Sequence, residues 1–271
     1  MPELPEVETT RRGIAPHITN RTVTKVTVRD PRLRWPVPKR LPQMLEGMKI
    51  TQVGRRGKYL LLETANGTAI LHLGMSGSLR IVDRTIPVGK HDHIDIVFDK
   101  DRILRLTDPR RFGAVLWTRR PPHQHKLLRD LGPEPLGAAF TGAYLHALAR
   151  GRKVAIKNFI MNSHIVAGIG NIYANEALYM AGIHPQRAAG RISNKKYTLL
   201  TEVIREVLND SIARGGTTLR DFVNSDGKQG YFSLDLNVYA KGGEPCISCR
   251  TLIREIRQGQ RATFYCPKCQ R

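Results

Sequence analysis

The first residues of the chain combine an amine nucleophile with carboxylates at short range. The sequence begins Met1-Pro2-Glu3-Leu4-Pro5-Glu6, and a small second residue such as Pro2 favours removal of the initiator methionine. The exposed amine of Pro2 would have an ordinary pKa of about 7.7–8.0, so a useful fraction is uncharged near neutrality. An uncharged amine can attack carbon, as lysine does when it forms a Schiff base. The alternative is a frayed terminus with a proline in the first turn of a helix.

The cysteines form a second group with a chemically specific spacing. All four lie near the C-terminus, as Cys246-x2-Cys249 and Cys266-x2-Cys269. Paired CxxC motifs in a reducing compartment are typical of a tetrahedral zinc site, whereas disulfides are the alternative in an oxidising one. The spacing predicts one structural Zn²⁺ bound by four thiolates.

The charge of the chain points to a polyanionic partner. Lysine and arginine number 44 against 23 aspartate and glutamate, which gives a formal net charge of +21. An excess of this size is typical of a protein that binds nucleic acid through phosphate contacts. A generally basic protein or a binder of anionic membranes is the alternative. The chain has no apolar run of about 20 residues and no signal peptide, so we expect a cytoplasmic protein without a membrane partner.

Two further segments could grip phosphate. Gly168-Ile169-Gly170-Asn171 opens an expected helix, where N-terminal amides favour an anion and Asn171 could cap the helix or donate to a phosphate. Arg261 lies on an expected hairpin of the cysteine-rich module, where a guanidinium could bind a phosphate bidentately. A tight turn and a solvated arginine are the alternatives.

Another segment could enter a DNA groove. Asp108–Gly113 joins a strand to a turn and contains two arginines and Phe112. Such a tip could fill a gap with the aromatic ring while an arginine reads a base edge, although a simple capped turn is equally consistent. Lys58, at the start of an apolar strand, and the histidines at 72, 91 and 93 are individually uninformative.

The rest of the sequence predicts a scaffold that contains both helices and strands. Residues 3–16 read as a helix, and the region from about 22 to 118 contains short alternating segments bounded by turn residues, which predict an antiparallel sandwich or barrel. The expected strands contain residues 23–28, 59–62, 69–71, 79–82, 94–98 and 103–106, with hairpin loops at 66–67 and 99–101. Two of the later helices are expected at 171–181 and 195–214. A polar, glycine-rich loop with a short strand should span 216–242, before a hairpin of strands 251–256 and 261–265.

Taken together, the segments resemble the formamidopyrimidine-DNA glycosylases, bifunctional enzymes that repair oxidised purines. The matching segments are Pro2–Thr9, Gly57-Lys58, His72–Gly77, His91–His93, Asp108–Gly113, Leu131–Leu136, Gly168–Tyr173 and the four cysteines with Arg261. The resemblance implies an α+β multidomain protein. The expected order is an N-terminal catalytic β-sandwich with flanking helices (1–120), a linker (121–137), a helix–two-turn–helix DNA-binding domain with a lesion loop (138–236) and a zinc-finger β-hairpin (237–271).

The resemblance also implies a mechanism and its residues. Pro2 would attack C1′ of a flipped nucleotide and form a Schiff base, with Glu3 as general acid and Glu6 as proton relay. Release of 8-oxoguanine or a formamidopyrimidine would be followed by β- and δ-elimination. The family assigns Lys58 and Arg261 as catalytic assistants, but an arginine pKa above about 12 makes a phosphate clamp the better physical role.

DNA contacts are implied at further positions that match the family. These positions are His72, Met75, His91, Arg110, Phe112, Arg152 and Asn171, and the loop at 217–231 would cover the flipped base. Among them, Met75, Arg110 and Phe112 match the trio that fills the void and faces the orphaned cytosine. The implied partner is double-stranded DNA with oxidised purines or abasic sites, bound by a monomer associated with the bacterial nucleoid.

Two alternatives stay open at this point. A relative of the same fold could remove oxidised pyrimidines, although the complete Met75, Arg110 and Phe112 set argues against it. A non-catalytic zinc-dependent DNA-binding protein is the other, and the intact Pro2, Glu3 and Glu6 start argues against that.

Overall fold

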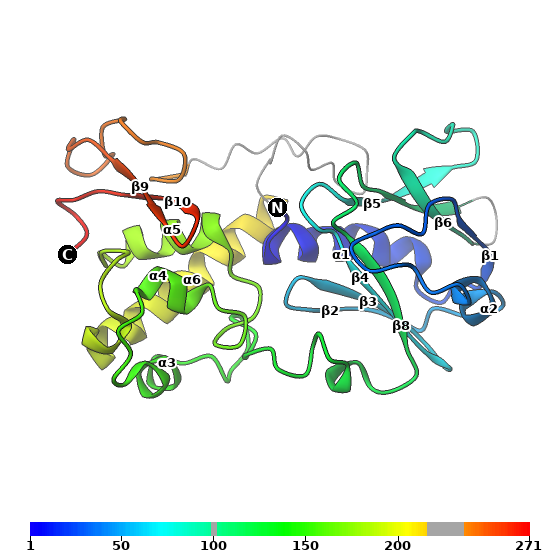
Figure 1. Ribbon diagram of the computed structural model, residues 1–271, viewed down its shortest axis with the longest axis horizontal. Coiled ribbons are helices and arrows are strands. Elements are labelled where there is room, and N and C mark those ends of the chain that lie inside the picture. Colours follow the sequence, from blue (N-terminus) through cyan, green and yellow to red (C-terminus); the bar gives the residue numbers. More distant parts are fainter. Residues whose placement is uncertain (99–101, 216–235) are drawn as a thin grey trace. The chain divides into compact units, whose positions relative to one another are not determined.

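The computed structural model describes residues 1–98, 102–215 and 236–271 of the chain (Figure 1). These residues group into two compact units. The first contains Met1–Arg129, and the second contains Asp130–Ala213 together with residues 236–271. The hairpin loop expected at 99–101 and the lesion loop expected at 217–231 lie outside the described residues. Within the described ranges, we find no helix with the length and apolar character that a membrane span needs.

The first unit is a sandwich of two four-stranded antiparallel sheets with flanking helices. One sheet has the strand order β1-β6-β7-β5 and the other the order β2-β3-β4-β8. The elements are α1 (Leu4–Ile18), β1 (Val23–Val28), α2 (Leu41–Leu45), β2 (Gln52–Arg56), β3 (Tyr59–Thr64), β4 (Gly67–His72), β5 (Ser78–Asp83), β6 (Asp92–Phe98), β7 (Arg102–Thr107) and β8 (Ala114–Thr118), followed by a 3₁₀ turn at Pro122–Gln124. The predicted sandwich is therefore confirmed. The sequence did not single out β2, because Val53 is its only buried residue.

The inner faces of both sheets and one side of α1 share a single apolar core. Its members include Val7, Ile14, Ile18, Leu60, Leu62, Leu71, Ile94, Ile96, Leu104 and Leu106. Helix α1 was predicted and ends two residues later than expected, because Ile18 is also fully buried. Burial of this many aliphatic side chains, each favourable by about 1.5–3 kcal/mol, fixes the helix start on the sheets.

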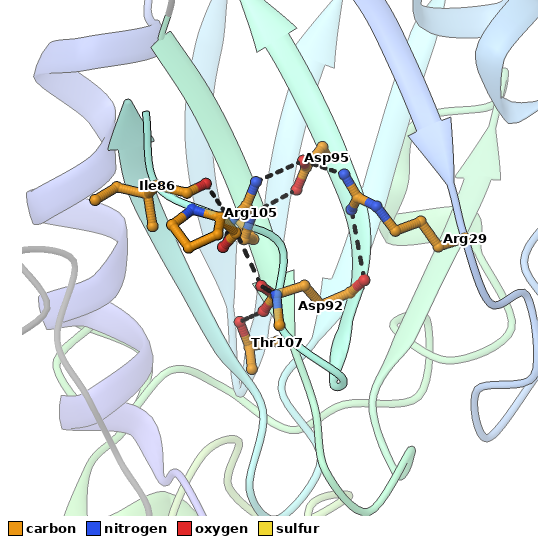
Figure 2. Close-up of polar contacts among 8 residues, drawn as sticks. Arg29, Ile86, Asp92, Asp95, Arg105 and Thr107 are labelled. Carbon is orange, nitrogen blue, oxygen red and sulfur yellow. Dashed lines mark hydrogen bonds and ion pairs between the residues drawn. The ribbon is translucent and has the colours of Figure 1, made fainter. Parts of the chain in front are cut away.

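The outer face of the sheet that contains β6 and β7 carries a buried group of charges (Figure 2). The Arg105 guanidinium donates to both carboxylate oxygens of Asp95, at 2.9 and 3.0 Å, and Arg29 donates to the same carboxylate at 2.6 Å. Asp92 accepts from the Thr107 hydroxyl at 2.5 Å. Both faces of β6 are therefore buried, which explains why its burial does not simply alternate.

The second unit combines helices with a C-terminal hairpin. Its elements are α3 (Gly142–Ala149), α4 (Ile156–Ile160), α5 (Asn171–Met180), a 3₁₀ turn at Ala189–Arg191, α6 (Asn194–Ala213), β9 (Arg254–Gln258) and β10 (Arg261–Tyr265). The predicted helices at 171–181 and 195–214 are confirmed as α5 and α6. The first strand of the hairpin was expected at 251–256 but begins later, because Ile253 pairs its backbone with Gly243 and Glu244 instead.

Candidate functional site

The chain start is an ordered, buried helix cap. Pro2 is buried, Glu3 is 2% exposed and Glu6 is 0% exposed. Glu3 is the N-cap residue of α1, and it forms a capping box in which its own backbone N–H donates to the Glu6 carboxylate at 2.8 Å. Carboxylates at this end also complement the positive pole of the helix dipole. The chain start is therefore buried and not frayed, although Pro5 does lie in the first turn of α1, as the alternative interpretation of the sequence expected.

Other charges of the first unit act on the same chain end. Burial lowers the pKa of the Met1 amino group, which precedes Pro2; the negative charges of Glu3 and Glu6 oppose this, and the positive charges of Arg110 and Lys58 add to it. A buried amine next to cations is held more in its uncharged form. The structure thus brings Lys58 and Arg110, which are far apart in the sequence, to the electrostatic surroundings of the terminal amine.

Lys58 is placed by a charge cluster that the sequence did not reveal. It lies in the β2–β3 turn, where Gly57 has a φ of +56°. Arg55, at the end of β2, donates to the Gly57 carbonyl at 2.8 Å and to the Glu8 carboxylate of α1 at 3.1 Å. Glu8 also accepts from Arg11 and Arg12 at 2.8 Å each. Glu8 therefore ties the turn that carries Lys58 to the helix that carries Glu3 and Glu6.

We expect Glu8→Gln to destabilise the first unit by about 2 kcal/mol at pH 7, because it removes the charge that three arginines share. Burial alone would raise the Glu8 pKa, but hydrogen bonds from Arg11 and Arg12 outweigh it and bring the pKa to about 2. The folded pKa lies below the unfolded one, so this stabilisation is present above about pH 4.5 and is lost as the pH falls towards 2.

Urea unfolding of the wild type and the variant at several pH values measures this effect. Glu202→Gln, at an exposed position of α6, is the control and should change stability by less than about 0.5 kcal/mol. A difference between wild type and Glu8→Gln that stays constant from pH 6 to pH 3 would contradict the role of Glu8.

Three of the expected DNA-contacting side chains project from two neighbouring loops. Met75 is 38% exposed and Phe112 is 48% exposed, and Arg110 is also exposed.

His72 lies at the end of β4, where burial and the nearby charges of Lys58 and Arg34 lower its pKa to about 4. Its Nδ1 accepts the backbone N–H of Gly74 at 3.0 Å. His72 is therefore neutral at pH 7 and carries its proton on Nε2.

His91 is held at the entrance of β6 by its neighbours. Its carbonyl accepts the backbone N–H of Asp108 at 3.0 Å. The next residue, Asp92, accepts from Thr107 and from the Gly89 backbone at 2.7 Å. The charge group of Figure 2 thus fixes the strand end that carries His91.

In the second unit, Asn171 and Arg261 lie side by side. The Asn171 side chain donates to the Ala262 carbonyl at 2.9 Å, and Arg261 is exposed at the start of β10. Gly170 is the N-cap of α5, so Asn171 does not cap the helix as one interpretation of the sequence had it. The second hydrogen of the Asn171 amide nitrogen is a candidate donor for phosphate.

Buried polar residues that the sequence did not single out anchor the hairpin. Lys157 is 0% exposed and donates to the Ala262 carbonyl at 3.0 Å and to the Thr263 hydroxyl at 2.6 Å. The Asn175 side chain accepts the Phe264 N–H at 2.8 Å. Together with Asn171, these bonds hold β10 against α4 and α5.

Arg152, at the turn after α3, lies with its guanidinium carbon 5.6 Å from the centre of the Phe159 ring.

The four cysteines come together as a zinc site requires. The sulfur atoms all lie within 4.8 Å of one another, with 3.4 Å between Cys249 and Cys266 and 3.9 Å between Cys246 and Cys269. Four thiolates around Zn²⁺ at about 2.3 Å would be roughly 3.8 Å apart, so the cluster fits one tetrahedral ion. The Tyr179 hydroxyl of α5 lies 3.2 Å from the Cys246 sulfur. The predicted structural zinc site is confirmed by this cluster and by the family match described next.

Three family models match successive parts of the chain. The formamidopyrimidine-DNA glycosylase N-terminal domain matches residues 1–115 and the formamidopyrimidine-DNA glycosylase H2TH domain matches residues 131–223. A zinc finger found in FPG and IleRS matches residues 243–271.

Full-length relatives show the same similarity. The chain is 62% identical to the formamidopyrimidine-DNA glycosylase of Methylococcus capsulatus over 271 residues, which are 100% of each chain. It is similar to the Lactococcus lactis FPG structure with Fapy-dG-containing DNA, with a TM-score of 0.89, 33% identity and coverage of 99% and 100% of the two chains. A complex of the Lactococcus lactis protein with abasic-site DNA has a TM-score of 0.89 and 32% identity, over 100% of both chains.

Proposed function

Since the chain belongs to the formamidopyrimidine-DNA glycosylase family, whose members are DNA repair glycosylases with AP lyase activity, we propose that it excises oxidised purines from double-stranded DNA and cuts the abasic strand. The substrates would be 8-oxoguanine, formamidopyrimidines and abasic sites. The observation that carries the proposal is the buried chain end, where Pro2 precedes the buried carboxylates of Glu3 and Glu6. The amino group of Met1, one residue from Pro2, feels the charges of Lys58 and Arg110. The division into domains at 1–120, 138–236 and 237–271, with a linker between the first two, belongs to the same proposal.

The first chemical step forms the covalent intermediate. After removal of Met1, the lone pair of the Pro2 nitrogen bonds to C1′ of a nucleotide flipped out of the duplex. The bond between C1′ and the damaged base breaks, and its electrons leave with the base, which takes up a proton. Glu3 protonates O4′ as the sugar ring opens to an iminium, and Glu6 accepts the proton that the attacking amine loses.

The second step cuts the DNA strand. The positive iminium acidifies the proton on C2′, and loss of this proton expels the 3′ phosphate by β-elimination. A further proton loss expels the 5′ phosphate by δ-elimination, and water then releases Pro2. Arg261 binds phosphate through these steps, because a guanidinium stays charged and is a poor proton donor, and Lys58 has the same proposed role.

Borohydride trapping tests the proposal directly. Reduction of the iminium would join the protein to DNA that contains 8-oxoguanine opposite cytosine, and mass spectrometry would place the adduct on Pro2. A parallel panel with oxidised pyrimidines distinguishes the related activity. Failure to trap any lesion, with tight DNA binding intact, would leave a non-catalytic DNA-binding protein instead.

A separate prediction divides the DNA-contacting residues into those that recognise the base opposite the lesion and those that bind phosphate. Arg110→Ala should relax the preference for cytosine opposite the lesion by about 1–3 kcal/mol, or roughly 5- to 150-fold, because an arginine–base contact is lost. Arg261→Ala should weaken binding to all sequences equally and reduce the salt slope by about one unit.

Excision of one oxidised purine opposite each of the four bases measures the first effect, and DNA affinity at two or more salt concentrations measures the second. Arg119→Ala, an exposed arginine just after β8, removes the same charge and serves as the control for Arg110. If Arg110→Ala slows excision opposite all four bases equally, Arg110 is a further phosphate contact and the division is wrong.

A further inference from the structure

The loops that carry Met75 and Phe112 cross between the two sheets at the same end of the sandwich. Residues 73–77 connect β4 to β5, and residues 108–113 connect β7 to β8. Strand β4 pairs with β8 through His72 and Ala114, so the two loops start from paired strands. They also touch, since a Cβ added to Gly74 would lie 2.4 Å from the carbonyl carbon of Phe112.

One buried carboxylate joins the two loops. Asp108 is 0% exposed; its Oδ1 accepts from the Ser76 hydroxyl at 3.0 Å and its Oδ2 accepts from the Gly113 N–H at 2.7 Å. The first bond reaches the residue next to Met75, and the second reaches the residue next to Phe112. Hydrogen bonds to a buried carboxylate are stronger than hydrogen bonds between neutral groups, so Asp108 holds the two loops together strongly.

Asp108 is itself fixed to the neighbouring strand. Its backbone N–H donates to the His91 carbonyl at 3.0 Å, and its carbonyl lies 2.8 Å from Nε2 of the buried His93. The same carbonyl accepts the Arg111 N–H at 3.2 Å, which closes the turn that presents Arg110. Every polar group of Asp108 therefore has a partner, and those partners lie in both loops and in β6.

We infer that Asp108 and Ser76 are positioning residues that hold Met75, Arg110 and Phe112 as one preorganised unit for insertion into the gap of a flipped nucleotide. This inference rests on the proposed function, which assigns gap filling to the three side chains. Without the bond from Ser76 to Asp108, each loop would have to be ordered separately on the DNA, and binding would bear that entropy cost. The bond to Gly113 alone would be enough to stabilise the loop at 108–113. The bond from Ser76 links this loop to the one that carries Met75, so the inference depends on the Ser76 bond.

The test compares single and double variants in binding to duplex DNA with a tetrahydrofuran abasic analogue opposite 2-aminopurine. Ser76→Ala should weaken binding by about tenfold, as expected for a hydrogen bond to a buried charge, and should reduce the 2-aminopurine fluorescence change. Met75→Ala should show a similar loss. The double variant should lose clearly less affinity than the sum of the two single losses, because Ser76 acts mainly by positioning Met75.

Controls separate positioning from stability. Ser78→Ala, at another buried serine two residues along the chain, should bind like the wild type, and Ser76→Thr should retain most of the affinity because it keeps the hydroxyl. Binding of undamaged DNA should not change. Wild-type affinity and fluorescence for Ser76→Ala, or fully additive losses in the double variant, would overturn the inference. If Met75→Ala and Phe112→Ala also bind like the wild type, the gap-filling part of the proposed function is wrong and the inference falls with it.

Discussion

A preparation that retains Met1 should not form the borohydride adduct and should lose base excision by about 10²-fold or more, because the nitrogen of Pro2 is then an amide. DNA binding should change little, since the proposed phosphate contacts are made by side chains and not by the amine. Pro2→Gly should fall to a similarly low level, because glycine lacks the ring that fixes φ and fills the buried position at the helix start.

The measurement requires a homogeneous protein whose N-terminus is defined by mass spectrometry. Trapping and single-turnover excision are compared between the Met1-retaining form and the form that begins with Pro2. Full excision by the Met1-retaining form would show that another amine attacks C1′, with Lys58 as the next nucleophile to examine.

The second large effect is expected on removal of a zinc ligand. Cys249→Ser should release the ion and unfold the hairpin, because the binding energy of a structural zinc, about 10–16 kcal/mol, is folding energy. Asn171 and Lys157 would then lose their bonds to Ala262, and Arg261 would lose its fixed position. We expect affinity for lesion and undamaged DNA to fall together, and by more than in Arg261→Ala, because both the Arg261 contact and the support of Asn171 are lost.

Zinc content by atomic absorption and DNA affinity by anisotropy measure these two effects separately. Lys268→Ala, between the last two cysteines, removes a charge without removing a ligand and should keep the ion. A zinc-free Cys249→Ser protein with wild-type affinity would exclude the hairpin as a DNA clamp.

Local patterns in the sequence were enough for most elements and for the metal site. The apolar stripe of α6, the Asn66-Gly67 hairpin turn and the CxxC pairs each depend on neighbours within a few residues. The supporting polar contacts could not be predicted, because they join distant residues: Arg55 binds Glu8 across 47 positions, and Lys157 binds Thr263 across 106. A lone lysine or glutamate in a basic chain carries no sign of such a partner. The roles of the DNA-contacting residues came from resemblance to the family and not from periodicity.

The capping box of α1 has an evolutionary consequence. The carboxylates that form the capping box also act by their charge on the terminal amine of Met1, so we expect a mutation at Glu3 or Glu6 to change both conformational stability and reactivity. A substitution at either position therefore couples these two properties. We therefore expect substitutions that adjust the stability of this helix without changing reactivity to lie further along α1, on its apolar side, and not in its first turn.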